Sequence, residues 1–547
     1  MLVAAAAAAL CSCQGGRARN AGPPSPAVVG DAGADDSAGS GEVVTDAGGD
    51  RAIGPADVDG GRGPEAASDA GPATTAGGPD SSTDAGIPDA TGAEPHGAGP
   101  DAGAADAVSS GSGSGSGGAG GSGGSGSGGV AGVGGIPGAA GAGPPPPPAD
   151  PLCAIDLSCA APIVDDPKVT CTLAIAGGDG RVIFSDHAGV ELRGRTSLFF
   201  PKKNYAIELR DAAGGDADTD LLNMGPDADW VLDGSWVDRS FVRGALIFDS
   251  FRALGAGRWA PEGRFCTLNL DGQPQGIYRL VEKIERGPSR LDIAADDGTG
   301  TSFVVKQDEQ GVLDLDIGID SRWKLVDPDQ DKATDAQRAG VQAWLNGLDA
   351  ALDSGTPADP TTGVLAYLDL ESTVDWVLIE ELSKNVDAYN LSLYFVRDRG
   401  GTARLVPWDL DLSLGQPTVT GELPGTEHND QPDGWIVHRS RLIQVLGRVP
   451  ALTSRLGPRW RALRATGGPL SDAALAARLD AYARVLTPAA LTQNFHIWPL
   501  ADVEYSSFYM PYTLYPVASY DDEVARLRAF VAARLAWIDA HIDAYPN

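Results

Sequence analysis

The sequence predicts an α+β fold in two lobes, a β-rich lobe followed by a helical one, behind a long segment without a core. Residues 14–150 consist mainly of Gly, Ala, Ser, Asp and Pro, and such a composition cannot bury enough apolar surface to offset the entropy of folding. Residues 151–547 begin with short alternating apolar runs and continue with apolar spacings of three and four. We therefore expect a disordered linker and one large domain, with lobes at about 165–310 and 311–545.

The first residues, 1–13, read MLVAAAAAALCSC and are predicted to form a signal peptide. The apolar stretch has the length of a signal-peptide core and is too short to span a membrane as a helix. Its end resembles a bacterial lipobox, in which Cys13 would carry the lipid. A plain signal peptide with chance cysteines is the alternative. We expect an exported lipoprotein at the cell envelope or surface, joined to the membrane only through that lipid.

The charge of the chain restricts its partners. The formal net charge is -33, which argues against nucleic acid, because a phosphate backbone is bound by basic surfaces. An acidic chain instead favours solubility, or a partner that is basic or bridged by cations. The expected partner is a secreted or envelope protein.

The cysteines of the domain favour disulfide bonds. An even number in an exported chain is typical of disulfides, and four cysteines allow three pairings. A zinc site is a weaker alternative, because the sequence has no CxxC pair and only six His. The four are Cys153, Cys159, Cys171 and Cys266.

The β-rich lobe is predicted from short alternating runs broken by Gly and Asp. These runs are VTCTLAIAG, RVIFSDHAGVELRGRTSLFF and NYAIELRD. SWVDRSFVRGALIFDSFRALGAG then has helical spacing, with Gly255 as its end. Strands return in RFCTLNLDGQPQGIYRLVEKIE, where DGQPQG is a hairpin turn, and in SFVVKQDE.

Helices dominate from about residue 333. TDAQRAGVQAWLNGLDAAL begins with the capping-box pair Thr334 and Gln337, and DLESTVDWVLIEELSKN forms a second helix. The last helix repeats apolar residues at spacings of three and four. These residues are Val524, Leu527, Val531, Leu535, Ile538 and Ile542.

One β-hairpin interrupts the helical lobe and brings acidic residues together. LSLYFV and ARLVPW are strand-like, and RDRGG between them is a turn. With the turn near Gly400, paired residue numbers sum to about 799, so Asn390 lies opposite Asp409, and Asp387 opposite a position close to Asp411. Such crowding is unfavourable unless a cation binds or one acid is protonated. Oxygen ligands of this kind suit Mg²⁺ or Mn²⁺ carrying phosphates; strand capping or pairing with Lys and Arg is the alternative.

Four ordered blocks of the sequence resemble landmarks of the CotH family, the spore-coat kinase-like proteins with an atypical protein-kinase fold. They are PKKNYAIELRD (201–211), WVLDGSWVDRSFVRGAL (230–246), GQPQGIYRLVEKIE (272–285) and VPWDLDLSLG (406–415), and the likeness spans roughly 165–540. The resemblance implies transfer of the γ-phosphoryl group of ATP, with Mg²⁺, to Ser or Thr of an exported or cell-surface protein. That chemistry needs a lysine on the phosphates, acids that hold the metal and a base near the acceptor.

The resemblance assigns roles to the acidic residues of the hairpin. Asp387 matches the catalytic-loop aspartate, and Asp409 matches the metal-binding aspartate, with Asp411 as a possible second ligand. Five residues after the catalytic aspartate, where that loop has asparagine, this chain has Ser392. Either Asn390 substitutes, or only one metal is held tightly. An inactive kinase-like protein that serves coat assembly or acts as a scaffold is therefore the alternative function, and calcium-dependent adhesion is a third.

Five other residues are candidates for binding the nucleotide. One of Lys202 and Lys203 would hold the phosphates, and Lys203 is the better candidate because it shares strand parity with the apolar residues that follow; an exposed lysine pair is the alternative. Arg243, at a helix start, would orient that lysine or the phosphates, or form a surface i,i+4 salt bridge. YRLVEKI resembles the strand that enters the kinase hinge, where adenine would lie near Glu282 and Lys283.

Overall fold

A computed structural model of the chain confirms the α+β class. The predictions for residues 1–150, and the position of Asn390, lie outside the described residues. The chain divides into two units, residues 1–17 with 132–547 and residues 18–131, and every described residue belongs to the first. Among the described helices, none has the length and hydropathy needed to cross a bilayer. The described residues are 151–194, 196–307, 323–389, 391–416, 418–419, 429–437, 440–500, 512–513 and 517–546.

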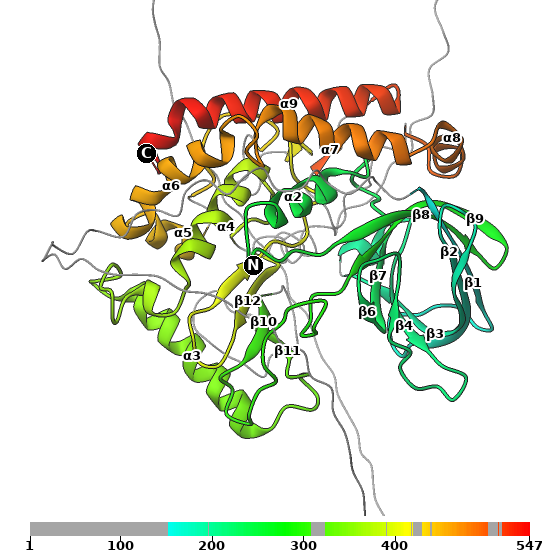
Figure 1. The fold of residues 1–547 in the computed structure, drawn as a ribbon, viewed down its shortest axis with the longest axis horizontal. Helices are drawn as coiled ribbons and strands as arrows, with labels where there is room; N and C mark the ends of the chain where they lie inside the picture. Colours follow the sequence, from blue (N-terminus) through cyan, green and yellow to red (C-terminus); the bar gives the residue numbers. More distant parts are fainter. Residues whose placement is uncertain are drawn as a thin grey trace, which may run out of the picture. The chain divides into compact units, whose positions relative to one another are not determined.

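A closed barrel of seven strands forms the first part of the fold (Figure 1). Its order is β1-β2-β3-β4-β7-β9-β8; β1 and β8 pair in parallel, and the other neighbours are antiparallel. Alternation fills the interior, as in β2, where Cys171, Leu173 and Ile175 are buried. The strands are β1 Cys153–Cys159, β2 Val169–Ala176, β3 Val182–Arg193, β4 Asn204–Arg210, β7 Asp229–Asp233, β8 Gly263–Leu270 and β9 Gln273–Glu282. The sequence predicted the runs of β2, β3, β4, β8 and β9, but it predicted neither β1 and β7 nor the closure of the sheet.

Both disulfides attach β1 to its neighbours in the barrel. Cys153 is bonded to Cys266 of β8, and Cys159 to Cys171 of β2. The disulfide prediction is confirmed, this pairing is selected from the three possible ones, and the zinc alternative is wrong. The two ends of β1 are thereby linked covalently to the strands on either side of it.

A second sheet contains the predicted hairpin. Its order is β11-β10-β12-β13. Phe395 pairs with Leu405 and Tyr394 with Val406, one position from the predicted register. The last strand ends at Val406 because Pro407 has no N–H for the ladder. These strands are β10 Phe303–Gln307, β11 Trp323–Asp327, β12 Leu393–Arg397 and β13 Arg404–Val406. Short pairs β5 Thr219–Asp220 with β6 Pro226–Asp227 and β14 Thr418–Val419 with β15 Tyr512–Thr513 complete the described sheets.

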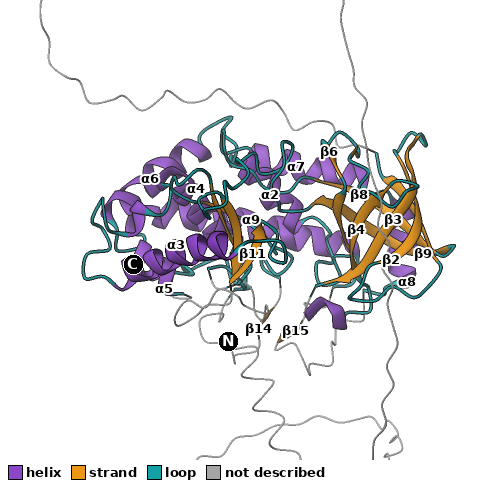
Figure 2. Cartoon of the chain, turned by 90° about the horizontal axis from the view of Figure 1, so that it is seen from below, coloured by secondary structure: helices purple, strands orange, loops and turns teal. Residues whose placement is uncertain are grey.

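The helices lie mainly beside the second sheet (Figure 2). The capping box at Thr334 and Gln337 is present. α4 is buried along almost its whole length and contacts α2, α6 and α9, while α8 packs on β9 of the barrel. The helices are α2 Arg243–Arg252, α3 Asp335–Asp353, α4 Leu370–Ser383, α5 Arg441–Leu446, α6 Pro450–Arg464, α7 Asp472–Val485, α8 Pro488–Ile497 and α9 Tyr520–His541, with 3-10 turns η1 Thr196–Phe199, η2 Val364–Ala366 and η3 Ile542–Ala544.

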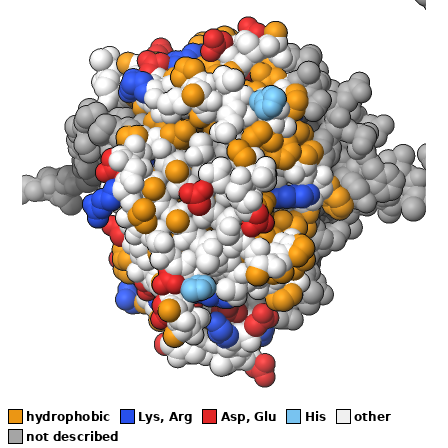
Figure 3. All heavy atoms as spheres, turned by 90° about the vertical axis from the view of Figure 1, so that its right-hand side faces the viewer, with side chains coloured by type: hydrophobic (Ala, Val, Ile, Leu, Met, Phe, Trp, Pro, Cys, Tyr) orange, Lys and Arg blue, Asp and Glu red, His pale blue; other side chains and the backbone are white. Residues whose placement is uncertain are grey.

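The face of the molecule on the barrel side carries charges of both signs. In Figure 3, acidic and basic side chains are scattered among apolar and uncharged atoms. The basic side chains visible on this face do not gather into the continuous patch that a nucleic-acid partner needs.

The two disulfides should contribute unequally to stability. In the chain-entropy model, the stabilisation grows with the length of the closed loop, from about 3 kcal/mol for a short loop to about 4.7 kcal/mol near one hundred residues. The Cys153–Cys266 bond spans 113 residues and the Cys159–Cys171 bond spans 12. Double alanine variants of each pair, compared by guanidinium unfolding of the full chain, should show the larger loss for the first pair. Equal losses would contradict the loop-length explanation.

Candidate functional site

A cleft of about 520 Å³ is lined by residues of the barrel, of α2 and of the second sheet with its flanking loops. Its volume lies within the range of small-molecule sites. Apolar side chains contribute part of the lining, among them Phe241, Phe248, Val281, Val386 and Leu412. Such a mixed surface can contact both apolar and charged groups of one ligand.

The predicted acids meet at this cleft. Asp387, which follows α4, lines the same cavity as Asp409 and Asp411, which follow β13. Further acids of the lining include Asp238 before α2 and Asp233, which the sequence did not single out. Asp233 ends β7 in the WVLDGSWVD block, and this position at a strand end is the signal that could have found it.

The backbone at Asp409 is held in an unusual conformation. Its φ is 58°, in the left-handed region that non-glycine residues rarely adopt. The Asn385 side chain donates to the Asp409 carbonyl at 2.9 Å, and the Ser392 hydroxyl donates to its carboxylate at 3.1 Å. These bonds join the two sides of the hairpin and fix the carboxylate. Strain of this kind is often found at functional sites.

The electrostatics of the cleft centre on Asp411. Burial raises the pKa of the Asp411 carboxyl well above its usual value, and the charges of Asp409, Asp233, Asp238 and Asp387 raise it further. The folded chain therefore holds several carboxylates close enough to oppose one another's ionisation. A cation in the cleft would relieve this opposition.

The acids suit a magnesium ion that arrives with a nucleotide. Mg²⁺ is commonly bound by one or two carboxylates together with phosphate oxygens and waters, and Asp409 and Asp411 provide two carboxylates on one cleft. In the part of the chain that the structure describes, no group of three His, Cys, Asp or Glu side chains could hold a metal ion. The donor set therefore fits a phosphate-borne ion and does not form an all-protein cage.

Lys202, and not Lys203, is the buried lysine. Lys202 is 2% exposed, whereas Lys203 is only half-buried and donates to the Leu198 carbonyl at 2.6 Å. The inward orientation predicted for Lys203 is wrong because β4 begins at Asn204, so strand alternation does not extend to either lysine. Neither lysine belongs to the cleft lining, and their roles toward phosphates stay predictions.

Lys202 occupies a largely apolar site next to α8. Its ammonium donates to the Ile277 carbonyl and to Asn494 Oδ1, and lies 4.7 Å from the centre of the Tyr278 ring. Burial lowers the pKa of Lys202 to about 7, with the nearby charge of Asp233 acting in the opposite direction. The lysine is therefore easily neutralised at physiological pH.

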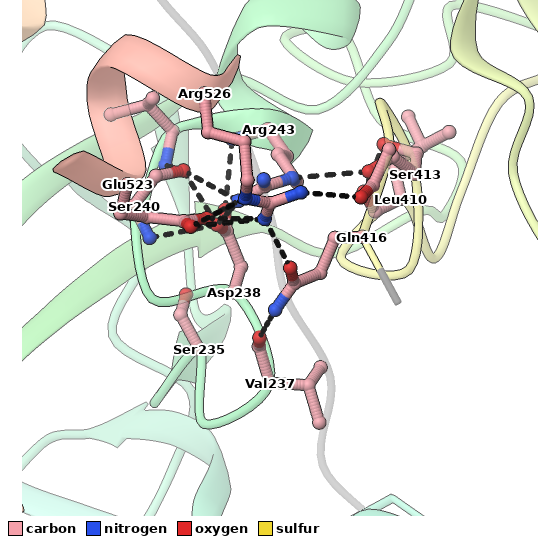
Figure 4. A network of polar contacts seen from close by, with 12 residues as sticks. Ser235, Val237, Asp238, Ser240, Arg243, Leu410, Ser413, Gln416, Glu523 and Arg526 are labelled. Atoms are coloured by element: carbon pink, nitrogen blue, oxygen red, sulfur yellow. Dashed lines mark hydrogen bonds and ion pairs between the residues drawn. The ribbon is translucent and has the colours of Figure 1, made fainter. Parts of the chain in front are cut away.

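Arg243 forms a buried network instead of lining the cleft (Figure 4). Its guanidinium pairs with Asp238 and with Glu523 of α9, each at 2.6 Å, and donates to the Ser413 carbonyl at 3.1 Å. The surface salt-bridge alternative is wrong, because Arg243 is fully buried. Figure 4 shows Arg526 reaching the same region, where it donates to Gln416 Oε1. Any effect of Arg243 on phosphates would pass through Asp238.

Glu282 and Lys283, predicted near the adenine, have their side chains in ion pairs. Glu282 is 3% exposed and pairs with Arg290 at 2.6 Å, and burial raises the pKa of Glu282 to about 7. Lys283 pairs with Glu285 and Asp229. Val281, one residue earlier on β9, lines the cleft, whereas Glu282 and Lys283 do not. Backbone contacts near them stay a prediction.

Four basic residues line the cleft within the described part of the chain, and none of them was among the predicted nucleotide ligands. The Arg193 guanidinium lies 5.1 Å from the centre of the ring of Trp408, the residue that precedes Asp409 in the sequence. The other three are Arg279 of β9, Lys306 of β10 and Lys324 of β11. Strand parity with Val281 is the signal that could have identified Arg279.

Comparison with protein families identifies the family of the chain. The family model described as CotH kinase protein matches residues 190–538. The chain therefore belongs to the CotH family, as the four sequence blocks indicated. The matched region runs from β3 to α9 and includes Asp387, Asp409 and Asp411. Comparison with curated proteins gave no match.

Lys202 should make stability depend on pH above neutrality. Its pKa is about 7 in the folded chain and about 10.4 when unfolded, so between these values the unfolded chain binds the additional proton and stability rises with pH. From pH 7 to pH 9 the wild type should gain about 2 kcal/mol relative to Lys202→Met. Denaturant unfolding of both proteins at the two pH values measures this difference. Parallel pH profiles would contradict a depressed pKa.

Arg243 should be important for folding. A charged side chain in a buried ion pair is costly to leave without its partner. Arg243→Met should lower the free energy of unfolding by about 3–5 kcal/mol, because Asp238 would stay buried as an unpaired carboxylate and Glu523 would keep only its pair with Arg526. Arg528→Met, which breaks a surface pair with Asp480, should cost less than about 1 kcal/mol. Denaturant unfolding compares the two variants, and similar losses would show that the network is not stabilising.

Proposed function

We propose that the chain is an ATP- and Mg²⁺-dependent protein kinase of the atypical two-lobed type, which phosphorylates Ser or Thr of an exported or cell-surface protein. The observation that carries the proposal is the convergence of Asp387 and Asp409, from opposite sides of one hairpin, on a single cleft. Membership of the CotH family supports it. The barrel would serve as the N-lobe and the helical part as the C-lobe.

The proposed reaction uses the cleft residues in distinct roles. The acceptor hydroxyl oxygen attacks the γ-phosphorus, the bond to the bridging oxygen breaks, and ADP leaves with the electron pair. Asp387 orients the hydroxyl and accepts its proton. Asp409 and Asp411 would hold Mg²⁺, which supplies charge neutralisation for the phosphates when bound. Apolar side chains such as Phe248 and Val281 offer a surface for the adenine.

The location of the activity is part of the same proposal. A lipid on Cys13, followed by the linker of residues 14–150, would place the domain at the cell envelope or surface, where it would meet secreted or envelope proteins. Asn390 would assist as a second metal ligand or beside Asp387. Mn²⁺ would satisfy the same oxygen ligands.

One observation favours the alternative of an inactive kinase-like scaffold. Ser392 stands where the catalytic loop of kinases has asparagine, and its hydroxyl donates to the Asp409 carboxylate. A serine at this place uses one oxygen of the metal-binding acid in an internal hydrogen bond. The cleft would then hold a partner or a nucleotide without transferring phosphate.

Removal of the central acids should abolish transfer. With labelled ATP, Mg²⁺ and a generic protein acceptor, Asp387→Ala should lower the rate of label transfer by about 10²–10⁴-fold, and Asp409→Ala should do the same through loss of the metal ligand. Asp480→Ala, which removes an exposed acid of α7, should leave the rate unchanged.

Three outcomes separate the hypotheses. Label that never exceeds the level of the Asp387→Ala, Asp409→Ala double variant would exclude the kinase. A nucleotide-induced rise in melting temperature without transfer would favour the scaffold. Stabilisation by Ca²⁺ with no effect of nucleotide would favour adhesion.

A further inference from the structure

Arg279 of β9 is a buried cation of the cleft for which the described chain offers no anion. The residue is 4% exposed and belongs to the cleft lining. Among the described residues, its buried Nε atom has no hydrogen-bond partner. No hydrogen bond or ion pair joins the other nitrogen atoms of its side chain to that part of the chain. Buried charges are normally paired, because removal from water is costly.

Three other buried arginines show how this protein normally satisfies such a group. Arg243 pairs with Asp238 and Glu523, and Arg290 pairs with Glu282 at 2.6 Å. Arg534 donates to the Glu381 carbonyl at 2.6 Å and to the Gly434 carbonyl at 2.7 Å. These three arginines all lie outside the cleft lining. Arg279 differs from them both in lining the cleft and in lacking a partner.

The carboxylates nearest to Arg279 have other partners. Asp249 accepts from the Tyr482 hydroxyl at 2.5 Å and pairs with Arg252. Asp233, which is opposite Arg279 on β7, accepts from the backbone N–H and the hydroxyl of Ser235. Both charges act on the guanidinium from a distance, yet burial still lowers the pKa of Arg279. The protein itself therefore compensates the charge only in part.

The Arg279 side chain is closely packed against residues of α2 and β8. The guanidinium lies 5.4 Å from the centre of the Phe248 ring of α2. In addition, a Cβ atom at Gly263 of β8 would lie 2.7 Å from Arg279 Nε and 2.9 Å from Cζ. Any larger residue at Gly263 would displace the guanidinium. The position of this cation is thus fixed by the barrel and by α2.

We propose that Arg279 is a ligand-binding residue of the cleft, which pairs with a phosphate group of the bound nucleotide. A guanidinium is always charged, carries only donors and matches phosphate oxygens with its planar fork. A cleft lined by Asp233, Asp387, Asp409 and Asp411 repels anions, so a fixed cation on the opposite strand gives a polyphosphate a point of attachment. The inference takes the identity of the ligand, a nucleotide, from the proposed function. The chemical group that Arg279 would recognise is a phosphate or pyrophosphate anion, whatever molecule carries it.

The proposal implies opposite effects on stability and on binding. Without ligand, Arg279→Met removes a buried charge and keeps a side chain of similar length, so the full-length variant should melt at a higher temperature than the wild type. With ligand, the same variant should lose its affinity for phosphate groups. A purely structural arginine would behave in the opposite way and lose stability on substitution.

The experiment measures calorimetric binding of ATP, adenosine and inorganic pyrophosphate, each with Mg²⁺, to the full chain. Arg279→Met should weaken ATP binding by about tenfold or more and abolish pyrophosphate binding, while adenosine affinity changes by less than about twofold. Arg279→Lys should retain part of the affinity for ATP. Arg484→Met, which removes an exposed arginine of α7, should bind all three compounds like the wild type.

Each result decides between the inference and the proposed function. ATP binding by Arg279→Met within twofold of the wild type, or a lower melting temperature without ligand, overturns the role of Arg279 and leaves the kinase proposal standing. If pyrophosphate binding depends on Arg279 but ATP binds no more tightly than pyrophosphate, the anion site is supported. The same result overturns the proposal that the ligand is a nucleotide. A wild type that binds none of the three compounds overturns both.

Discussion

The fold of the site depends on the buried Arg243 and its two carboxylates. This guanidinium joins the turn before α2, the loop that follows Asp411 and the first turn of α9, which are far apart in the sequence. Asp238 belongs both to this network and to the lining of the cleft. The position of the cleft acids is therefore coupled to the packing of the last helix on the rest of the chain, and a residue that touches no ligand still determines where the acids lie.

The cleft concentrates features that are unfavourable for stability. Asp409 has a left-handed backbone, and the pKa of the Asp411 carboxyl is raised by burial and by neighbouring acids. Arg279 is buried without an ion-pair partner among the described residues. Elsewhere in the described chain, the buried Arg243 and Arg290 form ion pairs with carboxylates, and helices α3, α4 and α9 have side-chain caps. Proteins commonly tolerate such local losses of stability where a ligand or a reaction needs the groups in place. The distribution of these features agrees with a binding site at the acidic hairpin.

Local signals in the sequence were sufficient to predict much of the fold and part of the candidate site. Alternation predicted most of the longer strands, although not β1 or β7. Thr334 and Gln337 predicted the start of α3, and the RDRGG turn predicted the hairpin to within one position. The closure of the barrel could not be predicted, because it depends on parallel pairing between β1 and β8, which are more than a hundred residues apart. The burial of Lys202 instead of Lys203 could not be predicted, because it depends on the exact residue at which β4 begins. The pairing of Arg243 could not be predicted either, because its partner Glu523 belongs to the distant helix α9. Arg279 went unnoticed because a missing partner can be recognised only when all neighbours are placed.

The two disulfides of β1 determine how the domain responds to mechanical load. A pull applied to the chain at its N-terminal side reaches Cys153 first, and from there it passes through sulfur to β8. Because β1 closes the barrel between β2 and β8, its detachment would open the barrel, and both disulfides oppose this as long as they stay oxidised. In a reducing environment, only the hydrogen bonds and the packing of β1 would resist the same pull.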